Sequence, residues 1–145
     1  MKITIEQVLE DAETEVVIRC HEIDESVRQI LYMLKSPERQ LLGAIDRELH
    51  LLEPEKVFYV ESVDDKIFIY GEQQVYESKK KLYELEAELT NYHFFRASKS
   101  LILNIKKIKS VHPLFDGRIE ALLTNNEKVF ISRKYVAVLK KKLGI

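Results

Sequence analysis

The last third of the chain concentrates its cationic side chains. Residues 91–145 hold 12 Lys/Arg and 3 Asp/Glu, whereas residues 1–50 hold 6 and 11, and residues 51–90 hold 5 and 10. The formal net charge of −1 therefore conceals a final segment of +9 that follows two segments of −5. Chance clustering is the alternative, but an excess of this size favours a polyanion, either nucleic acid or an acidic membrane, as the partner.

Two cations stand where a helix is expected to begin. Ser132 is followed by Arg133 and Lys134, and the pattern after them predicts the final helix. Cations at a helix N-terminus oppose its dipole by about a few tenths of a kcal/mol each. Either both side chains point into water, or they and the free backbone N–H groups converge on a phosphate.

A second basic segment interrupts two apolar strands. Residues 96–100 (RASKS) form a polar break whose side chains can carry hydrogen-bond donors into a groove, and Lys106, Lys107 and Lys109 follow closely. Lysines also protect edge strands against aggregation. That role accounts for one or two of them and not for the excess across the whole segment.

Catalysis has little support in the sequence. Cys20 and the histidines at 21, 50, 93 and 112 are scattered, and neither a glycine-rich phosphate loop nor metal-ligand spacing accompanies them. A nucleophile and its base would have to be assembled from these few groups. We therefore expect no enzyme activity, no cofactor, no metal site and no small-molecule substrate.

The first third predicts a small β-β-α segment, residues 1–48. Residues 2–5 and 15–20 have strand patterns, and a helix that begins at Asp24 or Ser26 continues to residue 35. Residues 40–45 and 48–52 then predict two strands that turn at Asp46-Arg47.

From residue 49 onward the pattern predicts a mostly β (α+β) domain with short helices, residues 49–145. One helix is expected to begin at Ser78 and end at Leu89, and the last is expected to be capped by Ser132. Asp116-Gly117 and Asn125-Asn126 are typical of hairpin turns. The expected strands cover residues 57–61, 66–70, 74–76, 94–96, 100–103, 105–111, 118–123 and 128–131.

Three segments in order resemble the LytTR DNA-binding family. They are residues 57–62 (VFYVES), 94–108 (FFRASKSLILNIKKI) and 129–135 (VFISRKY), and the resemblance covers about residues 50–145. It implies an elongated β fold that lays loops into successive major grooves of double-stranded DNA. It also implies a sequence-specific transcriptional regulator that binds direct repeats and forms a homodimer on DNA.

The resemblance assigns DNA contacts to individual positions. It places them at Lys66, at Ser98 and Lys99 with Arg96 at the base of their loop, at Arg118, and at Arg133 or Lys134. It gives Ser100 and Asn104 a structural role in the DNA-binding loop.

The N-terminal segment is too short for the phosphorylated receiver domain that many response regulators of this family carry. The resemblance implies a stand-alone, response regulator-like protein, and some of these are inhibited by a small membrane protein. The wide apolar face at Ile30, Leu31, Tyr32, Met33 and Leu34 is the expected dimer or partner surface. The alternative is a helix that packs on its own domain.

Other binding functions compete with this interpretation. A protein–protein interaction module is harder to exclude from the sequence, and a salt titration against duplex DNA would distinguish it from a DNA-binding protein. An RNA-binding module needs exposed aromatic rings between basic residues, whereas Phe94, Phe95, Phe115 and Phe130 fall at expected strand positions and predict core residues. The chain has no apolar stretch of transmembrane length and no signal-peptide pattern at its start, so we expect a cytoplasmic protein.

Overall fold

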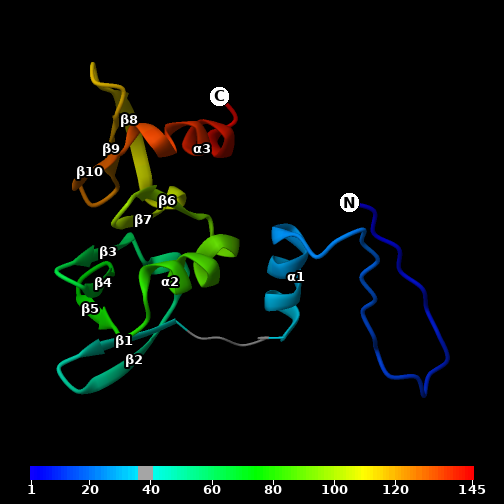
Figure 1. The fold of residues 1–145 in the computed structure, drawn as a ribbon. Coiled ribbons are helices and arrows are strands. Elements are labelled where there is room, and N and C mark those ends of the chain that lie inside the picture. The colour runs from blue at the N-terminus through cyan, green and yellow to red at the C-terminus, as the bar shows by residue number, and fades with distance from the viewer. Residues whose placement is uncertain (36–40) are drawn as a thin grey trace. The chain divides into compact units, whose positions relative to one another are not determined.

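The computed structural model describes residues 1–35 and 41–145 (Figure 1). The chain forms two compact units, Met1–Pro37 and Glu38–Ile145, which we call unit 1 and unit 2. Among the described residues, no helix is long and apolar enough to cross a membrane.

Unit 1 contains the helix α1 (Glu25–Lys35), and its start is fixed by Asp24. The Asp24 carboxylate accepts hydrogen bonds from the Val27 N–H at 3.0 Å and from the Ser26 hydroxyl at 2.8 Å. These two bonds, the Val27 bond above all, hold the pKa of Asp24 below its ordinary value. Of the two expected caps, Asp24 is therefore the one that accepts the backbone N–H.

The two strands expected before α1 are a wrong prediction, because residues 1–24 form no strand. Their apolar side chains remain in solvent, with exposed fractions of 77% for Ile3 and 67% for Val17. An alternating pattern becomes a strand only when another strand satisfies its backbone and a core covers one face. Unit 1 offers these segments neither.

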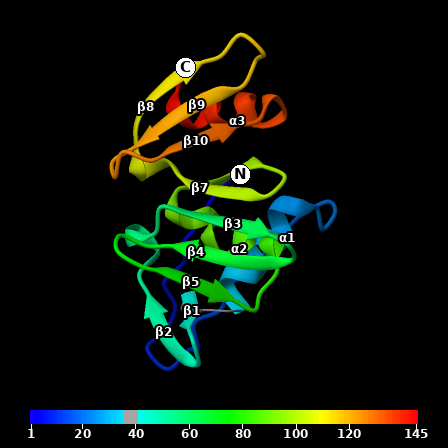
Figure 2. The ribbon, with the colours of Figure 1, turned by 90° about the vertical axis from the view of Figure 1, so that its left-hand side faces the viewer.

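Unit 2 is built on a seven-stranded antiparallel sheet and a three-stranded one (Figures 1 and 2). The strand order is β2-β1-β5-β4-β3-β7-β6 in the first sheet and β10-β9-β8 in the second. The strands are β1 (Leu41–Ile45), β2 (Glu48–Leu52), β3 (Tyr59–Val63), β4 (Lys66–Tyr70), β5 (Val75–Ser78), β6 (Phe94–Ser98), β7 (Leu101–Asn104), β8 (Ile108–Pro113), β9 (Ile119–Leu123) and β10 (Lys128–Ile131).

Short helices connect and cover these sheets. The α-helices are α2 (Leu82–Leu89) and α3 (Arg133–Leu143), and the 3-10 turns are η1 (Pro54–Lys56), η2 (Thr90–Tyr92) and η3 (Ile105–Lys107). The expected mostly β fold with short helices is confirmed.

The large sheet begins earlier in the chain than the expected domain start at residue 49. β1 pairs with β2 along its length and meets β5 at Ala44 and Glu77. Leu41 is buried in the core beside α2. Gly43 permits the close approach, since a Cβ there would lie 2.5 Å from the Cβ of Tyr76. The division between the compact units accordingly lies at Pro37/Glu38 rather than at residue 48.

Ser78 does not cap a helix, contrary to expectation. It is the last residue of β5, where it pairs with Ile67 and is buried. α2 starts at Leu82, and the Glu84 carboxylate accepts the Lys81 N–H at 3.3 Å. Because burial and strand pairing hold Ser78 in the sheet, the helix is delayed by one turn.

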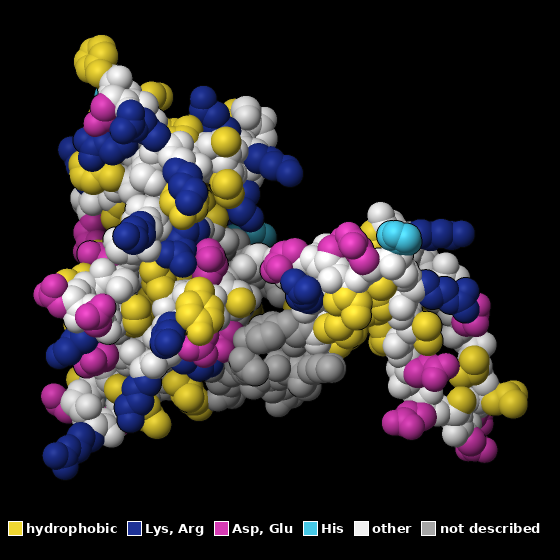
Figure 3. Space-filling view, viewed as in Figure 1, with side chains coloured by type: hydrophobic (Ala, Val, Ile, Leu, Met, Phe, Trp, Pro, Cys, Tyr) yellow, Lys and Arg dark blue, Asp and Glu magenta, His cyan; other side chains and the backbone are white. Residues whose placement is uncertain are grey.

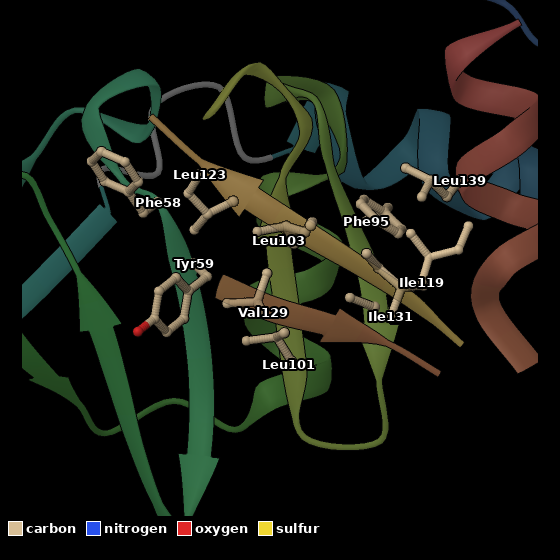
Figure 4. Close-up of a cluster of buried hydrophobic side chains, with 12 residues drawn as sticks. Phe58, Tyr59, Phe95, Leu101, Leu103, Ile119, Leu123, Val129, Ile131 and Leu139 are labelled. Carbon is tan, nitrogen blue, oxygen red and sulfur yellow. The ribbon is translucent and has the colours of Figure 1, made fainter. Parts of the chain in front are cut away.

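The large sheet is buried on both faces around β3, β7 and β6. Tyr59, Leu101 and Leu103 point into a core shared with the three-stranded sheet and with Leu139 of α3 (Figure 4). Their neighbours Val60 and Ile102 point to the opposite face. There they form a second core with α2. Alternation with period two thus builds two cores from the same strands.

Two of the four phenylalanines expected in the core lie at the surface. Phe94 and Phe95 are buried, whereas Phe130 is 44% exposed and Phe115 is fully exposed. Phe130 belongs to β10 but faces outward, and Phe115 lies in the turn after β8. The expectation that Phe115 is a core residue is wrong, because the chain turns back at this position and leaves the side chain in solvent.

Candidate nucleic-acid interface

Three connections of unit 2 meet at one end of the sheets. The Ser62 N–H, near the end of β3, donates to the Ser100 carbonyl at 2.8 Å, which joins the β3–β4 and β6–β7 turns. The Ser132 N–H donates to the Ala97 carbonyl at 2.9 Å, which joins the start of α3 to the same region. Figure 2 shows the end of β3, the β6–β7 turn and the end of β10 on one side of unit 2.

The β8–β9 turn lies at this end as well. Ile119, the first residue of β9, pairs both with Pro113 at the end of β8 and with Ile131 at the end of β10. We call this region the loop edge. It consists of the β3–β4 turn (64–65), the β6–β7 turn (99–100), the β8–β9 turn (114–118) and the β10–α3 junction at Ser132.

Arg96 supports the β6–β7 turn from within. Its Nη1 donates to the Lys99 carbonyl at 2.6 Å, and its Nε lies 3.2 Å from a Glu86 carboxylate oxygen on α2. The side chain is only 19% exposed. Arg96 therefore positions the turn, and its guanidinium is already engaged by protein groups.

Arg96→Ala is expected to weaken DNA binding about tenfold, because the β6–β7 turn loses its link to α2 and one charge-assisted hydrogen bond. Arg96→Lys should rescue little, since one ammonium cannot reproduce both contacts of the guanidinium fork. Fluorescence anisotropy on a duplex measures the affinity. Lys128→Ala serves as the control, and wild-type affinity for Arg96→Ala would contradict the positioning role.

Lys99 is the exposed cation of the β6–β7 turn, and the partly buried Ser98 is the last residue of β6 before it. Lys99 is exposed and makes no ion pair within the described residues. The register between β6 and β7 shifts at Ala97, and the Ser98 hydroxyl accepts the Ser100 N–H at 3.2 Å. The bulge and the bond together present the lysine at a fixed turn.

The β10–α3 junction presents Arg133 and Lys134. Ser132 precedes α3, but its hydroxyl lies 3.4 Å from the Ala97 carbonyl and caps no helix N–H, contrary to the expected side-chain cap. Arg133 and Lys134 are both exposed. Lys134 lies over the Tyr135 ring at 5.5 Å. Two cations thus flank the positive end of α3, an arrangement suited to an anion.

Arg118 is held at the base of the β8–β9 turn. Its Nε donates to Asp116 at 2.7 Å, and its guanidinium lies 5.0 Å from the centre of the Phe130 ring. The Arg118 N–H, followed by its side chain, lowers the pKa of Asp116 by hydrogen bonding. This link is fully present at neutral pH and is lost as the pH falls through the lowered pKa.

Lys66 follows the β3–β4 turn, where Asp64 and Asp65 adopt positive φ angles of 50° and 64°. Lys66 is exposed and has no ion-pair partner within the described part of the chain. Ile67 pairs with Ser78, the last residue of β5, so Lys79 follows β5 at the end of the sheet where Lys66 begins β4.

Lys79 is the residue that the sequence interpretation missed. The helix expected at residues 78–89 included Lys79, whereas the structure places it, exposed, directly after β5, and its neighbour Lys80 pairs with Glu88. Lys79 lies there because β5, which ends at Ser78, pairs with β4. The sequence pattern around Lys79 favoured a helix instead, so this strand pairing was not predicted.

The remaining cations of the last third do not share this edge. Lys107 pairs with Glu72 and lies over the Phe58 ring, and Lys128 pairs with Glu120 at the start of β10. The others at the far ends of β8 and α3 are Lys106, Lys109, Lys140, Lys141 and Lys142. The +9 segment is therefore spread over two ends of unit 2, and Figure 3 shows several of its cations on the visible face.

Asn104 and Ser100, the two residues expected to support the DNA-binding loop, lie at opposite ends of β7. The buried Asn104 side chain donates to the Val57 carbonyl at 2.8 Å and accepts the Lys106 N–H at 3.0 Å. It therefore fixes the turn after β7, at the end of that strand opposite the loop edge. Ser100 lies in the β6–β7 turn, which it ties to β3 through its carbonyl.

The expected partner surface lies on α1. Ile30 and Leu31 are partly buried, and Met33 and Leu34 are 50% and 47% exposed. The side chain of Tyr32 lies outside the described residues. Figure 3 shows hydrophobic side chains gathered on this helix.

A solved structure has the same fold as unit 2. A LytTr DNA-binding domain from Bacillus cereus is similar with a TM-score of 0.70 and 26% identity, over 74% of this chain and 99% of that one.

Relatives of different length also match. The Sensory transduction protein LytT of Enterococcus faecalis is 35% identical over 97 residues, which are 67% of this chain and 40% of LytT. The chain thus spans well under half of that relative. An HTH-type transcriptional regulator of Staphylococcus aureus is 26% identical over 147 residues, covering 100% of this chain and 99% of its own length.

The match to the family is specific to the part of the chain that carries the loop edge. Residues 47–144 match the family model described as the LytTr DNA-binding domain, and the chain belongs to the LytTR family.

Proposed function

We propose that this chain is a sequence-specific transcriptional regulator that inserts loops of its loop edge, among them the β6–β7 turn and the start of α3, into successive major grooves of repeated DNA sites. The observation that carries the proposal is the gathering of exposed cations on turns at one end of unit 2. These are Lys66, Lys79, Lys99, Arg133 and Lys134. Turns that project from a rigid sheet hold hydrogen-bond donors at defined positions relative to a bound duplex.

The spacing of the strands suits a duplex that lies along this edge. From β5 to β7 the order is β5-β4-β3-β7, and neighbouring strands are about 4.8 Å apart. Lys79 and the β6–β7 turn are therefore separated by roughly 15 Å, about half of a DNA helical turn of roughly 34 Å. The start of α3, with Arg133 and Lys134, adds a further pair of cations along the same edge.

Assembly on DNA is the second part of the proposal. One unit of this size reaches a short stretch of duplex, so two protomers on direct repeats supply specificity. The apolar face of α1 at Ile30, Leu31, Met33 and Leu34 is the surface proposed to join them or to receive an inhibitor. A membrane-protein inhibitor that bound this surface in the cytoplasm would compete with the second protomer.

The deciding experiment is selection of duplexes from a random library with the full chain. Enrichment of a spaced direct repeat supports the regulator. Enrichment of no sequence, together with salt-insensitive binding, would favour a protein–protein module. Preference for single-stranded RNA over duplex DNA would favour the RNA-binding alternative.

Lys99→Ala is expected to relax base preference at one position of the selected site and to weaken binding by about 1–3 kcal/mol. Arg133→Ala is expected to weaken all sequences alike, as the loss of a phosphate contact does. Competition binding with single-base variants of the site separates the two effects. Equal, sequence-independent losses in both variants would contradict the base contact of Lys99.

A further inference from the structure

The tip of the β8–β9 turn carries a fully exposed aromatic side chain. The relative exposure of Phe115 is 113%, whereas Phe94 and Phe95 are each 3% exposed or less. Phe115 belongs to neither core. No described side chain of unit 2 therefore covers its ring.

A structured turn holds this ring in place. The Leu114 N–H donates to the Arg118 carbonyl at 2.9 Å, and the Gly117 N–H donates to the Leu114 carbonyl at 3.1 Å. The Arg118 N–H donates to the Asp116 carboxylate at 3.1 Å. Gly117 has a φ of +88°, which a side chain at this position would strain. These hydrogen bonds fix the backbone of the turn before and after Phe115, and this turn presents the ring.

Two cations stand at the base of the same turn. Arg118 lies against Phe130, and Arg133 packs beside Gly117, where an added Cβ would lie 2.9 Å from the Arg133 Cδ. Asp116 offsets one of the two charges. An apolar tip above a net positive base matches the apolar base stack and the phosphates of a duplex.

The surroundings favour a base stack over a protein partner. The Arg118 guanidinium lies over the Phe130 ring, which is 44% exposed, and Leu114 is partly buried. Phe115 is thus a single projecting ring rather than part of a broad apolar patch. Protein interfaces bury a contiguous area much larger than one side chain.

We propose that Phe115 is a wedge that enters the minor groove next to the site contacted by the start of α3. There it partly unstacks one base step and bends the duplex. Major and minor grooves alternate along one face of DNA, so the turn beyond an element in the major groove meets a minor groove. Apolar wedges of this type kink DNA, most easily at flexible pyrimidine–purine steps. This inference rests on the proposed function.

The test uses the full chain and the duplex selected from the random library, with 2-aminopurine at successive positions and fluorophores at both ends. Wild-type protein is expected to raise 2-aminopurine fluorescence at one step beside the α3 contact and to shorten the end-to-end distance. Phe115→Ala should abolish the fluorescence rise and reduce the bend, and Phe115→Leu should retain part of both. The salt dependence of binding should not change, because no phosphate contact is lost.

Leu49→Ala is the matched control, since Leu49 is also exposed but lies on β2, the edge strand farthest from β6 in the large sheet. It should bind and bend DNA as wild type does. If wild-type protein binds the duplex without any rise in 2-aminopurine fluorescence, the wedge is wrong but the proposed function stands. Loss of affinity in Phe115→Ala with unchanged fluorescence and bending would overturn the wedge too. Failure of wild-type protein to bind any duplex would overturn the proposed function itself.

Discussion

Raising the salt concentration from 50 to 200 mM is expected to weaken duplex binding by this protein about 200-fold. If about four phosphates are neutralised per protomer, the log–log slope of affinity against salt is about −4, because each contact contributes about −0.9. The cations of the loop edge supply these contacts. They are exposed, and Lys66, Lys79 and Lys99 make no ion pair within the described residues.

Two single variants test which cations carry this dependence. Lys79→Ala should make the slope less negative by about 0.9, since one phosphate contact is lost. Lys128→Ala should leave the slope unchanged, because Lys128 pairs with Glu120 at 3.2 Å at the far end of β10. Titrations at several salt concentrations give the slopes. A wild-type slope near zero would mean that the loop edge does not contact the DNA backbone.

Deletion of residues 1–40 is expected to leave a folded unit 2 that binds one repeat, whereas deletion of residues 1–48 is expected to unfold it. The longer deletion removes β1 and with it Leu41, which is 3% exposed and part of the core beside α2. Loss of one such leucine costs about 2–5 kcal/mol. A domain with a typical stability of about 5–15 kcal/mol does not tolerate this together with the lost strand pairing.

Circular dichroism melts and electrophoretic titrations on one-repeat and two-repeat duplexes measure these outcomes. The shorter deletion should melt cooperatively and bind a single repeat as the full chain does. It should lose cooperativity on two repeats, because α1 is absent. Equal cooperativity in both proteins would mean that α1 does not join protomers. A folded 1–48 deletion would contradict the structural role of β1.

Local patterns in the sequence were sufficient for most elements of unit 2. The expected strand at 66–70 coincides with β4, and the expected strand at 128–131 coincides with β10. The turns at Asp46-Arg47 and Asp116-Gly117 also lie between strands. Alternation and turn chemistry depend on residues close together in the chain, which is why they can be recognised before any tertiary contact is known.

Tertiary structure decided which cations are paired with other protein groups and which are exposed at the loop edge. Arg96 has the residue type of a DNA contact, yet Glu86 and the Lys99 carbonyl engage it, and Lys107 pairs with Glu72. Lys79 reaches the loop edge only because β5 pairs with β4. A count of charges gives their number, but their positions depend on strand pairing.

The sequence by itself determined the family resemblance, the mostly β class and the concentration of cations in the last third of the chain. Only the tertiary structure placed β1 in the large sheet, left residues 1–24 without a strand and turned Phe115 outward. The physical reason is the same in each case. A periodic pattern sets which conformation a segment favours, whereas burial and hydrogen-bond partners from distant segments decide whether that conformation forms and which side chains remain exposed.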